Sequence, residues 1–306
     1  MDTYRLYVEG RWEEPAEGGF LETRNPATGE VVARFARATA PDADRAVAAA
    51  RRAFDEGGWN GATSPRTRAR LLLAVAEEIR RRRDELARLE TMDVGKRLAD
   101  AEEDVDEAAY MFEYYAGWAT KVDGSVPPVG AEALSLVVTE PVGVSVLITP
   151  WNFPLLMAAQ KVAPALAAGC PAILKPAEDT PLTAIALAEI IDGAGFPPGA
   201  FQLLTGLGTE VGAALVAHPG VDKISFTGSE TVGKEIQRVA ADTLKRVTLE
   251  LGGKSPSIVF ADADLDAAFE ASAFGVFYNQ GEVCSAGARV LVERPIYEQA
   301  VAAMKD

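Results

Sequence analysis

The chain has 306 residues, of which 48% are hydrophobic and 25% charged, which is typical of a globular protein of about two domains. Its net charge of −15 argues against binding to nucleic acid or to an anionic membrane, because both need a basic surface. One histidine excludes a zinc site built on two or three histidines, and two distant cysteines do not suggest a disulfide framework, so we expect a cytoplasmic protein without a metal.

The first 120 residues predict short strands followed by helices. Short β-like runs and turns occupy most of the first 60 residues, and a helix is expected over 41–54. Ser64-Pro65 predicts an N-cap with proline at the first helical position. The helix that follows is expected to carry one apolar face made of Leu71, Leu72, Val75, Ile79, Leu86 and Leu89. A further helix from about Leu98 to Trp118 is expected to point its acidic residues outward.

Between Val142 and Glu250, apolar strand candidates alternate with helix candidates. This alternation, with fully apolar strands, predicts an α/β fold with a parallel sheet covered by helices on both faces. Such sheets bind ligands at the carboxyl ends of their strands. The segments 134–140 and 142–148 are expected to be two strands joined across Pro141. Four prolines and a lysine interrupt the apolar stretch 142–173, so we expect no membrane span there.

The segment after Lys254 predicts the beginning of a second α/β unit. It contains a strand in SPSIVF, a helix from about Leu265, a small-residue turn, a strand in ARVLVE and a last helix. The run DADLD (262–266) resembles the start of a calcium loop. Its sixth and twelfth positions are alanine rather than glycine and glutamate, so Asp262 or Asp264 is better interpreted as a helix cap.

A thiol and a carboxylate suggest covalent acyl chemistry. Cys284 lies on a turn flanked by glycines, and Glu250 stands at the end of a strand-like run. A thiol can attack a carbonyl, and a carboxylate can act as the base in the second half of such a reaction. A single cysteine is more often a small buried apolar residue, and this is how we interpret Cys170.

Two further strand ends carry groups suited to anions. TPWNFP (149–154) holds Asn152 in a stiff turn with its NH2 free to donate, as a developing oxyanion requires. FTGSETVG (226–233) places Gly228 and Ser229 at the start of a helix, where free N–H groups and the helix dipole favour a phosphate.

Two weaker motifs also suit a nucleotide. In LKPAED (174–179), Lys175 and Glu178 could bind ribose hydroxyls, although a surface ion pair would explain the same residues. TGLGTEVG (205–212) resembles a dinucleotide-binding glycine loop through Gly206, Gly208 and Gly212, and such clusters are often only tight turns.

Five motifs in this order and spacing resemble the aldehyde dehydrogenase superfamily, in its NAD(P)-dependent, non-phosphorylating branch. They are TPWNFP, LKPAEDTP, FTGSETVG, ELGGKSP and NQGEVCSAGARVLVE. The resemblance covers nearly the whole chain, and its general character is similar to betaine-aldehyde and amino-aldehyde enzymes. Gln160 departs from the pattern, because many relatives carry a bulky aromatic residue there.

The resemblance implies a role for each motif residue. Cys284 matches the nucleophile, Glu250 the general base, and Asn152 the oxyanion donor together with the Cys284 backbone N–H. A carboxylate at Glu178 implies a preference for NAD over NADP, because it would repel a 2′-phosphate. The implied cofactor contacts are Lys175 and Glu178 for the adenosine ribose, Ser229 for the pyrophosphate, and Trp151 and Gly228 along the cofactor channel.

The resemblance also implies a domain plan. Residues 1–120 and 141–252 would form a Rossmann-like NAD-binding domain, 121–140 an oligomerisation-type hairpin, and 253–306 the start of a catalytic domain that continues well beyond Asp306 in the family. The expected activity is oxidation of a small-molecule aldehyde by a possible homo-oligomer. One alternative is a non-catalytic fragment that at most binds NAD. An enzyme that passes its thioester to coenzyme A is disfavoured, because Glu250 supplies a hydrolytic base.

Overall fold

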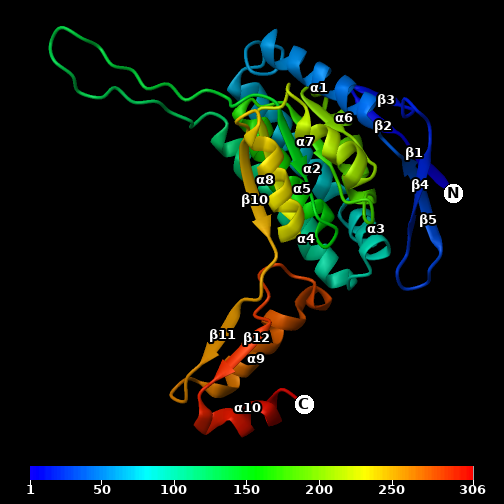
Figure 1. Cartoon of the computed structure of the whole chain (residues 1–306), viewed down its shortest axis with the longest axis vertical. Coiled ribbons are helices and arrows are strands. Elements are labelled where there is room, and N and C mark those ends of the chain that lie inside the picture. The colour runs from blue at the N-terminus through cyan, green and yellow to red at the C-terminus, as the bar shows by residue number, and fades with distance from the viewer. Residues whose placement is uncertain (306) are drawn as a thin grey trace.

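The computed structural model describes residues 1–305 and confirms the α/β class, with a large body above a small lobe (Figure 1). A seven-stranded sheet runs through the large body. Its five parallel strands, in spatial order, are β10 (Arg246–Leu251), β9 (Lys223–Gly228), β6 (Ser145–Ile148), β7 (Ala172–Lys175) and β8 (Phe201–Leu203). The sheet continues antiparallel through β2 (Leu6–Val8) and β3 (Arg11–Glu13), which the strand–helix alternation does not indicate.

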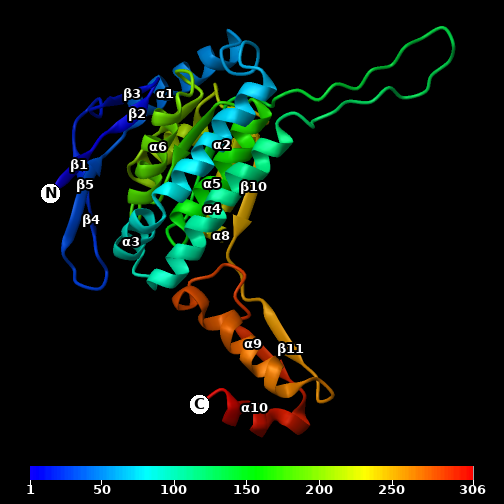
Figure 2. The same cartoon turned by 180° about the vertical axis from the view of Figure 1, so that it is seen from behind.

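Helices cover both faces of this sheet, as Figures 1 and 2 show from opposite sides. One layer contains α2 (Pro65–Arg81), α4 (Leu98–Trp118), α5 (Pro154–Ala168) and α6 (Leu182–Ala194), with α3 (Arg83–Val94) beside it. The other contains α1 (Ala40–Asp55), α7 (Ala213–Ala217) and α8 (Glu230–Ala241). Within residues 1–305, none of the helices combines the length and the apolar character needed to cross a bilayer.

The helix predictions are confirmed in part. Ser64 caps α2, because its hydroxyl accepts the N–H of Thr67 at 3.2 Å. The prediction of one continuous helix is wrong, since the chain breaks at Arg82 and Leu86 belongs to α3. The prediction that the acidic residues of α4 all point outward is also wrong: Asp100 and Asp104 are buried.

Three predictions about strands need correction. Segment 134–140 forms no strand; Ser125 and Val137 make one isolated antiparallel bridge within a long arm that projects from the body (Figure 1). The strand predicted over 142–148 is shorter than expected and forms only β6. Strand β10 is not fully buried, because its side chains alternate between partly covered and exposed. That the arm, 121–140, joins subunits stays a prediction.

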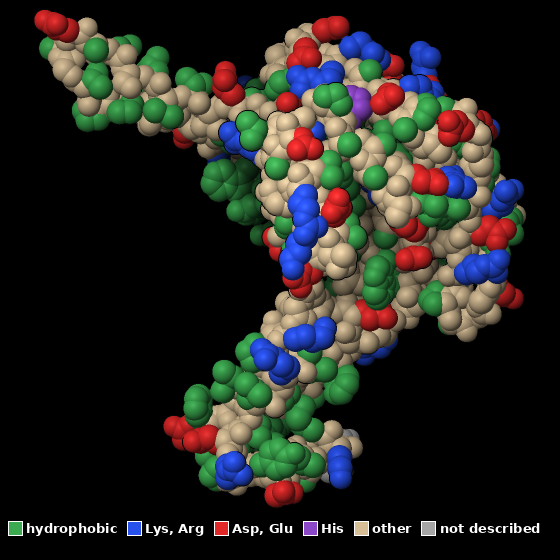
Figure 3. Space-filling model, in the orientation of Figure 1, with side chains coloured by type: hydrophobic (Ala, Val, Ile, Leu, Met, Phe, Trp, Pro, Cys, Tyr) green, Lys and Arg blue, Asp and Glu red, His purple; other side chains and the backbone are tan. Residues whose placement is uncertain are grey.

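The small lobe, residues 256–305, is a parallel strand–helix–strand unit. Strand β11 (Pro256–Val259) pairs with β12 (Arg289–Val292), and α9 (Leu265–Phe277) connects them, with Asp264 as its cap. The 3₁₀ turn η2 (Tyr278–Gly281) follows α9, while η3 (Arg294–Ile296) and α10 (Tyr297–Ala303) end the lobe. Its buried core consists of Val259, Phe269, Ile296 and Ala300. Apolar side chains such as Phe260, Phe274 and Phe277 are exposed, and Figure 3 shows apolar surface on this lobe.

A second, three-stranded sheet lies beside the large body. It contains, in spatial order, β1 (Asp2–Tyr4), β5 (Val31–Ala36) and β4 (Phe20–Arg24). Thr23 on β4 fixes it to the body, because its hydroxyl donates to the Asp93 carboxylate at 2.6 Å. Asp93 also accepts the backbone N–H of Leu182 at 2.9 Å. One buried carboxylate therefore links this sheet to α6.

Candidate active site

Two cavities meet at Cys284. The first, of 960 Å³, lies where the large body faces the small lobe and is lined by Asn152, Ser229 and the turn 281–285, among others. The second, of 630 Å³, is lined by Lys161 and Glu250, among others. Met157, Thr227 and Cys284 line both. The residue predicted as nucleophile is therefore reachable from two sides.

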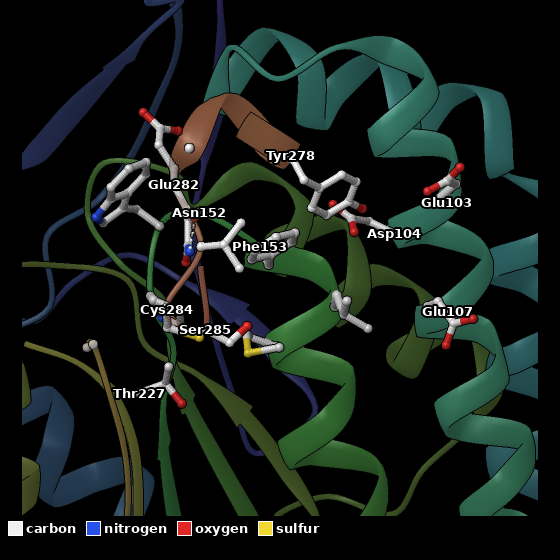
Figure 4. A pocket seen from close by; sticks show the side chains of 18 of the residues that line it. Glu103, Asp104, Glu107, Asn152, Phe153, Thr227, Tyr278, Glu282, Cys284 and Ser285 are labelled. Atoms are coloured by element: carbon white, nitrogen blue, oxygen red, sulfur yellow. Dashed lines mark hydrogen bonds between the residues drawn. The ribbon is translucent and has the colours of Figure 1, made fainter. Parts of the chain in front are cut away.

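The turn that carries Cys284 belongs to the small lobe, and the cysteine is exposed. Three residues before it have positive φ angles in succession: Asn279 at 47°, Gln280 at 59° and Gly281 at 79°. This left-handed run ends α9 and turns the chain back toward the body. In Figure 4, Cys284 and Ser285 lie below Asn152, with Thr227 beneath them.

Asn152 lies in the turn between β6 and α5, with a proline two residues to either side. Its Nδ2 donates to the backbone carbonyl of Glu282 at 2.5 Å. The expectation that its NH2 is free is therefore wrong for one of the two N–H bonds. The second N–H remains available, and the first fixes the amide against the turn that carries Cys284.

Glu250 lines the second cavity rather than the first, so Cys284 stands between it and Asn152. Glu250 lies near the end of β10 and is exposed. Lys161 lines the same cavity, and its Nζ donates to the Ser225 hydroxyl at 2.9 Å. Burial lowers the pKa of Lys161 to about 8, against the opposing effect of the Glu250 carboxylate. Sequence reasoning missed this lysine, because a lone lysine in an apolar helix gives no local signal.

Helix α4 contributes carboxylates to the first cavity. Glu103, Asp104 and Glu107 line it and lie on the helix across from Cys284 (Figure 4). Sequence reasoning treated this acidic face as solvated surface. The negative charge on this side of the cavity disfavours an anionic group beside α4.

The ion pair that was the alternative interpretation of LKPAED is present, and the predicted ribose contacts stay a prediction. Lys175 ends β7 and is buried, and its Nζ donates to Glu178 at 2.7 Å. Burial lowers the pKa of Lys175, although Glu178 opposes this effect. Burial alone would raise the pKa of Glu178, but the Lys175 ammonium and backbone N–H donors together outweigh it and the pKa is lowered. Glu178 therefore stays ionised at neutral pH, with both groups at the carboxyl edge of the sheet.

The glycine loop approaches this ion pair. The N–H of Gly208 donates to Glu178 at 3.3 Å. Gly206 has a φ of 142°, and a Cβ there would lie 2.9 Å from the backbone nitrogen of Ala38, so only glycine fits. Gly208 to Gly212 then form one turn of π-helix, η1, before α7. The glycine loop and the Lys175–Glu178 ion pair are thus joined by a hydrogen bond into one polar cluster.

Gly228 and Ser229 line the first cavity, at the end of β9 and the start of α8. The Ser229 hydroxyl accepts the N–H of Val232 at 3.3 Å, which leaves its own hydrogen free to donate. Trp151 lines the same cavity and is exposed. The neighbouring Thr227 hydroxyl is buried without a hydrogen-bond partner among residues 1–305. An elongated ligand with an anionic centre and polar ends suits this edge, and NAD has that chemistry.

A buried ion cluster lies beneath the turn that holds Asn152. Lys96 is fully buried and pairs with Glu90 at 3.2 Å and with Asp104. Its Nζ also lies 4.3 Å from the centre of the Phe153 ring. Burial raises the pKa of Glu90 to about 7, although Lys96 opposes this. No local pattern indicates the cluster, because charged residues are rarely fully buried.

Replacing Lys96 with methionine is expected to lower the free energy of unfolding by about 3–5 kcal/mol, because two buried carboxyl groups lose their cation. Urea unfolding followed by circular dichroism measures this loss. Lys234→Met is the matched control: Lys234 pairs with Glu230 on the surface, and such pairs contribute about 0–1 kcal/mol. Equal losses in the two variants would contradict a structural role for the cluster.

Comparison with known proteins gives matches over nearly the whole chain. The sequence matches the family described as "Aldehyde dehydrogenase family" over residues 12–306. It is 49% identical over 299 residues to betaine aldehyde dehydrogenase 1 of Oryza sativa subsp. japonica, covering 95% of this chain and 59% of that protein. It is 47% identical over 299 residues to retinal dehydrogenase 2 of Homo sapiens, covering 97% of this chain and 58% of that one.

Solved structures agree with the sequence matches. A betaine aldehyde dehydrogenase from Staphylococcus aureus in complex with NAD+ superposes with a TM-score of 0.96 at 42% identity, covering 98% of this chain and 60% of that one. An NAD-dependent aldehyde dehydrogenase from Sinorhizobium meliloti gives a TM-score of 0.96 at 43% identity, covering 99% and 61%. The chain therefore spans about three fifths of the length of these relatives.

Proposed function

The chain belongs to the aldehyde dehydrogenase family, and from that premise we propose that it oxidises an aldehyde to a carboxylic acid with NAD. One observation carries the proposal: Cys284 is exposed where two cavities meet, with Asn152 on one side and Glu250 on the other. A nucleophile, a fixed neutral donor and a base are the groups that the two halves of such a reaction need.

In the first half, the Cys284 thiolate attacks the aldehyde carbon and a carbon–sulfur bond forms. The carbonyl oxygen becomes an alkoxide, which the unused N–H of Asn152 is positioned to stabilise. Because the amide is already held by the Glu282 carbonyl, it need not reorganise as the charge develops. A bound NAD would supply the hydride acceptor, and loss of hydride from this adduct would leave a thioester on Cys284.

In the second half, Glu250 accepts a proton from water, and the hydroxide equivalent adds to the thioester carbon. The carbon–sulfur bond then breaks, which releases the carboxylic acid and returns the Cys284 thiolate. Glu250 can deliver this water from the second cavity, while the first holds the aldehyde and the cofactor.

The cofactor is proposed to lie along the carboxyl edge of the sheet. Lys175 and Glu178 would hold the adenosine ribose, Ser229 and the first N–H groups of α8 the pyrophosphate, and Trp151 and Gly228 the channel between. The ion pair between buried Lys175 and partly exposed Glu178 supports this placement, as does the Thr227 hydroxyl, which has no hydrogen-bond partner among residues 1–305. NAD+ is bound in the S. aureus relative.

Replacing Glu178 with glutamine is expected to reduce the preference for NAD over NADP by about tenfold or more, because removing its charge removes the repulsion of a 2′-phosphate. Isothermal titration of both dinucleotides measures the ratio of dissociation constants. Glu189→Gln, on the outer surface of α6, is the control and should leave the ratio unchanged. An unchanged ratio in the Glu178 variant would contradict its role in cofactor choice.

The proposal is tested by incubating the purified chain with NAD and a short aldehyde while NADH absorbance is followed. Formation of NADH and carboxylic acid in equal amounts supports it. Binding of NAD without NADH would instead identify a non-catalytic form. A reaction that proceeds only with added coenzyme A would show acyl transfer in place of hydrolysis.

A further inference from the structure

Asn279 is a buried residue that neither half of the proposed reaction uses. Its side chain is 1% exposed, although the residues beside it are partly or fully exposed. Its backbone is left-handed, with φ and ψ both at 47°. Such a conformation costs most residues about 1–2 kcal/mol, and asparagine is one of the few that tolerates it. A buried amide held in this unfavourable conformation points to a structural or functional role for the residue.

The amide of Asn279 connects two segments that are far apart in the sequence. Its Nδ2 donates to the backbone carbonyl of Asn152 at 3.3 Å and to that of Glu282 at 3.4 Å. Asn152 is on the large body, 127 residues away, whereas Glu282 is two residues before Cys284. One side chain thus contacts both the turn of the proposed oxyanion donor and the turn of the proposed nucleophile.

The three residues form a closed network. The Glu282 carbonyl accepts from the side-chain amides of both Asn152 and Asn279, while Asn279 also holds the backbone of Asn152. Since one N–H of Asn152 is used on Glu282, the direction of the other depends on where the Glu282 carbonyl lies. Moving that carbonyl would redirect the donor and displace the cysteine together.

Asn279 also leaves a polar atom unpaired. Its Oδ1 is buried without a hydrogen-bond partner among residues 1–305. A buried unpaired oxygen is costly, and so is the left-handed backbone. Both costs fall on the residue that makes the two connections. If packing alone determined position 279, a small apolar side chain would fill it without leaving a buried oxygen unpaired.

We propose that Asn279 is a positioning residue that locks the turn of Asn152 to the turn of Cys284. The contacts above support the structural role of Asn279, and its catalytic role rests on the proposed aldehyde oxidation. Asn279 holds the Asn152 amide and the Cys284 sulfur in one arrangement, so that the alkoxide forms within reach of its donor.

Hydrogen–deuterium exchange tests the structural part without any need for turnover. Asn279→Gly removes the amide but suits the left-handed backbone, and Asn279→Asp keeps the size but places an oxygen against two carbonyls. Both variants are expected to speed exchange at least about fivefold in peptides covering 150–155 and 281–287. Gln280→Gly is the matched control, because Gln280 is exposed and equally left-handed, and exchange in 150–155 should stay within about twofold of the wild type.

The decisive peptide is 150–155, because glycine at position 279 could loosen its own turn but not a turn on the other side of the network. Unchanged exchange of 150–155 in both Asn279 variants would overturn the proposal. If Asn279→Asp fails to fold, by circular dichroism, the glycine variant decides alone.

The pre-steady-state burst of NADH tests the catalytic part. Asn279→Gly is expected to slow the burst by about 10- to 100-fold, since small misplacements of reacting groups have effects of this size. The dissociation constant of NAD and the rate of Cys284 alkylation by iodoacetamide should stay within about twofold, because neither needs the Asn152 donor. An unchanged burst would overturn this part. If the wild-type chain forms no NADH, the proposed function fails, whereas the exchange result still decides the role of Asn279.

Discussion

Replacing Cys284 with alanine is expected to lower the rate of NADH formation from an aldehyde by at least about 10³-fold, because the covalent route disappears. The thiol is exposed in this chain, with a cavity on either side. NAD binding should be retained, since the residues proposed to hold the adenosine and the pyrophosphate lie on the large body. Absorbance and calorimetry measure the two properties in the same preparation.

The second cysteine provides the control. Cys170 is buried before β7, and Cys170→Ala should leave the rate within about threefold of the wild type. Iodoacetamide should modify Cys284 first, because Cys170 is shielded from solvent. A Cys284→Ala chain that still forms NADH at the wild-type rate would show that the thiol is not the nucleophile.

Replacing Glu250 with glutamine is expected to separate the two halves of the reaction. Attack by Cys284 and loss of hydride need no water, so a burst of NADH close to one per active site should remain. Hydrolysis of the thioester needs the base, so the steady-state rate should fall by about 10²–10⁴-fold. Stopped-flow absorbance measures both phases, and intact-protein mass spectrometry should detect the acylated chain.

Glu235→Gln is the matched control, because Glu235 is an exposed carboxylate on α8 that pairs with Arg238. It should leave both phases unchanged. A Glu250 variant with an unchanged steady state would remove this residue from the mechanism. A variant without the burst, but with wild-type affinity for NAD, would place Glu250 in the first half instead.

Local sequence patterns predicted the helix bounds and caps that depend only on neighbouring residues. Helix α4 runs from Leu98 to Trp118, as its periodicity indicates, and Ser64 caps α2 because serine before proline is a strong start signal. The break at Arg82 was not predictable from apolar spacing, because Leu86 continues the spacing of Ile79 across it. The chain turns there to pack α3 against α4 and α6, which is a tertiary effect.

The site residues also fall into those that a local pattern indicates and those that it does not. Residues at strand ends, such as Lys175 and Ser229, could be named in advance because the carboxyl ends of parallel strands share one edge. Lys96, Lys161 and Asn279 could not, since each acquires its meaning from partners that only folding brings near. Asp104 was misread for this reason: the sequence shows one of many acidic residues on a helix, whereas in the structure it is buried against a lysine.

The division of the molecule into a large body and a small lobe affects the order in which the protein loses its properties. Cys284 is on the lobe, whose buried core has four residues, whereas Asn152 and Glu250 are on the body, which has two extensive cores. Small cores resist denaturation poorly, so the lobe should loosen at lower urea concentrations than the seven-stranded sheet. Inactivation would then precede the loss of most secondary structure, and a preparation could look folded by circular dichroism after its chemistry has gone.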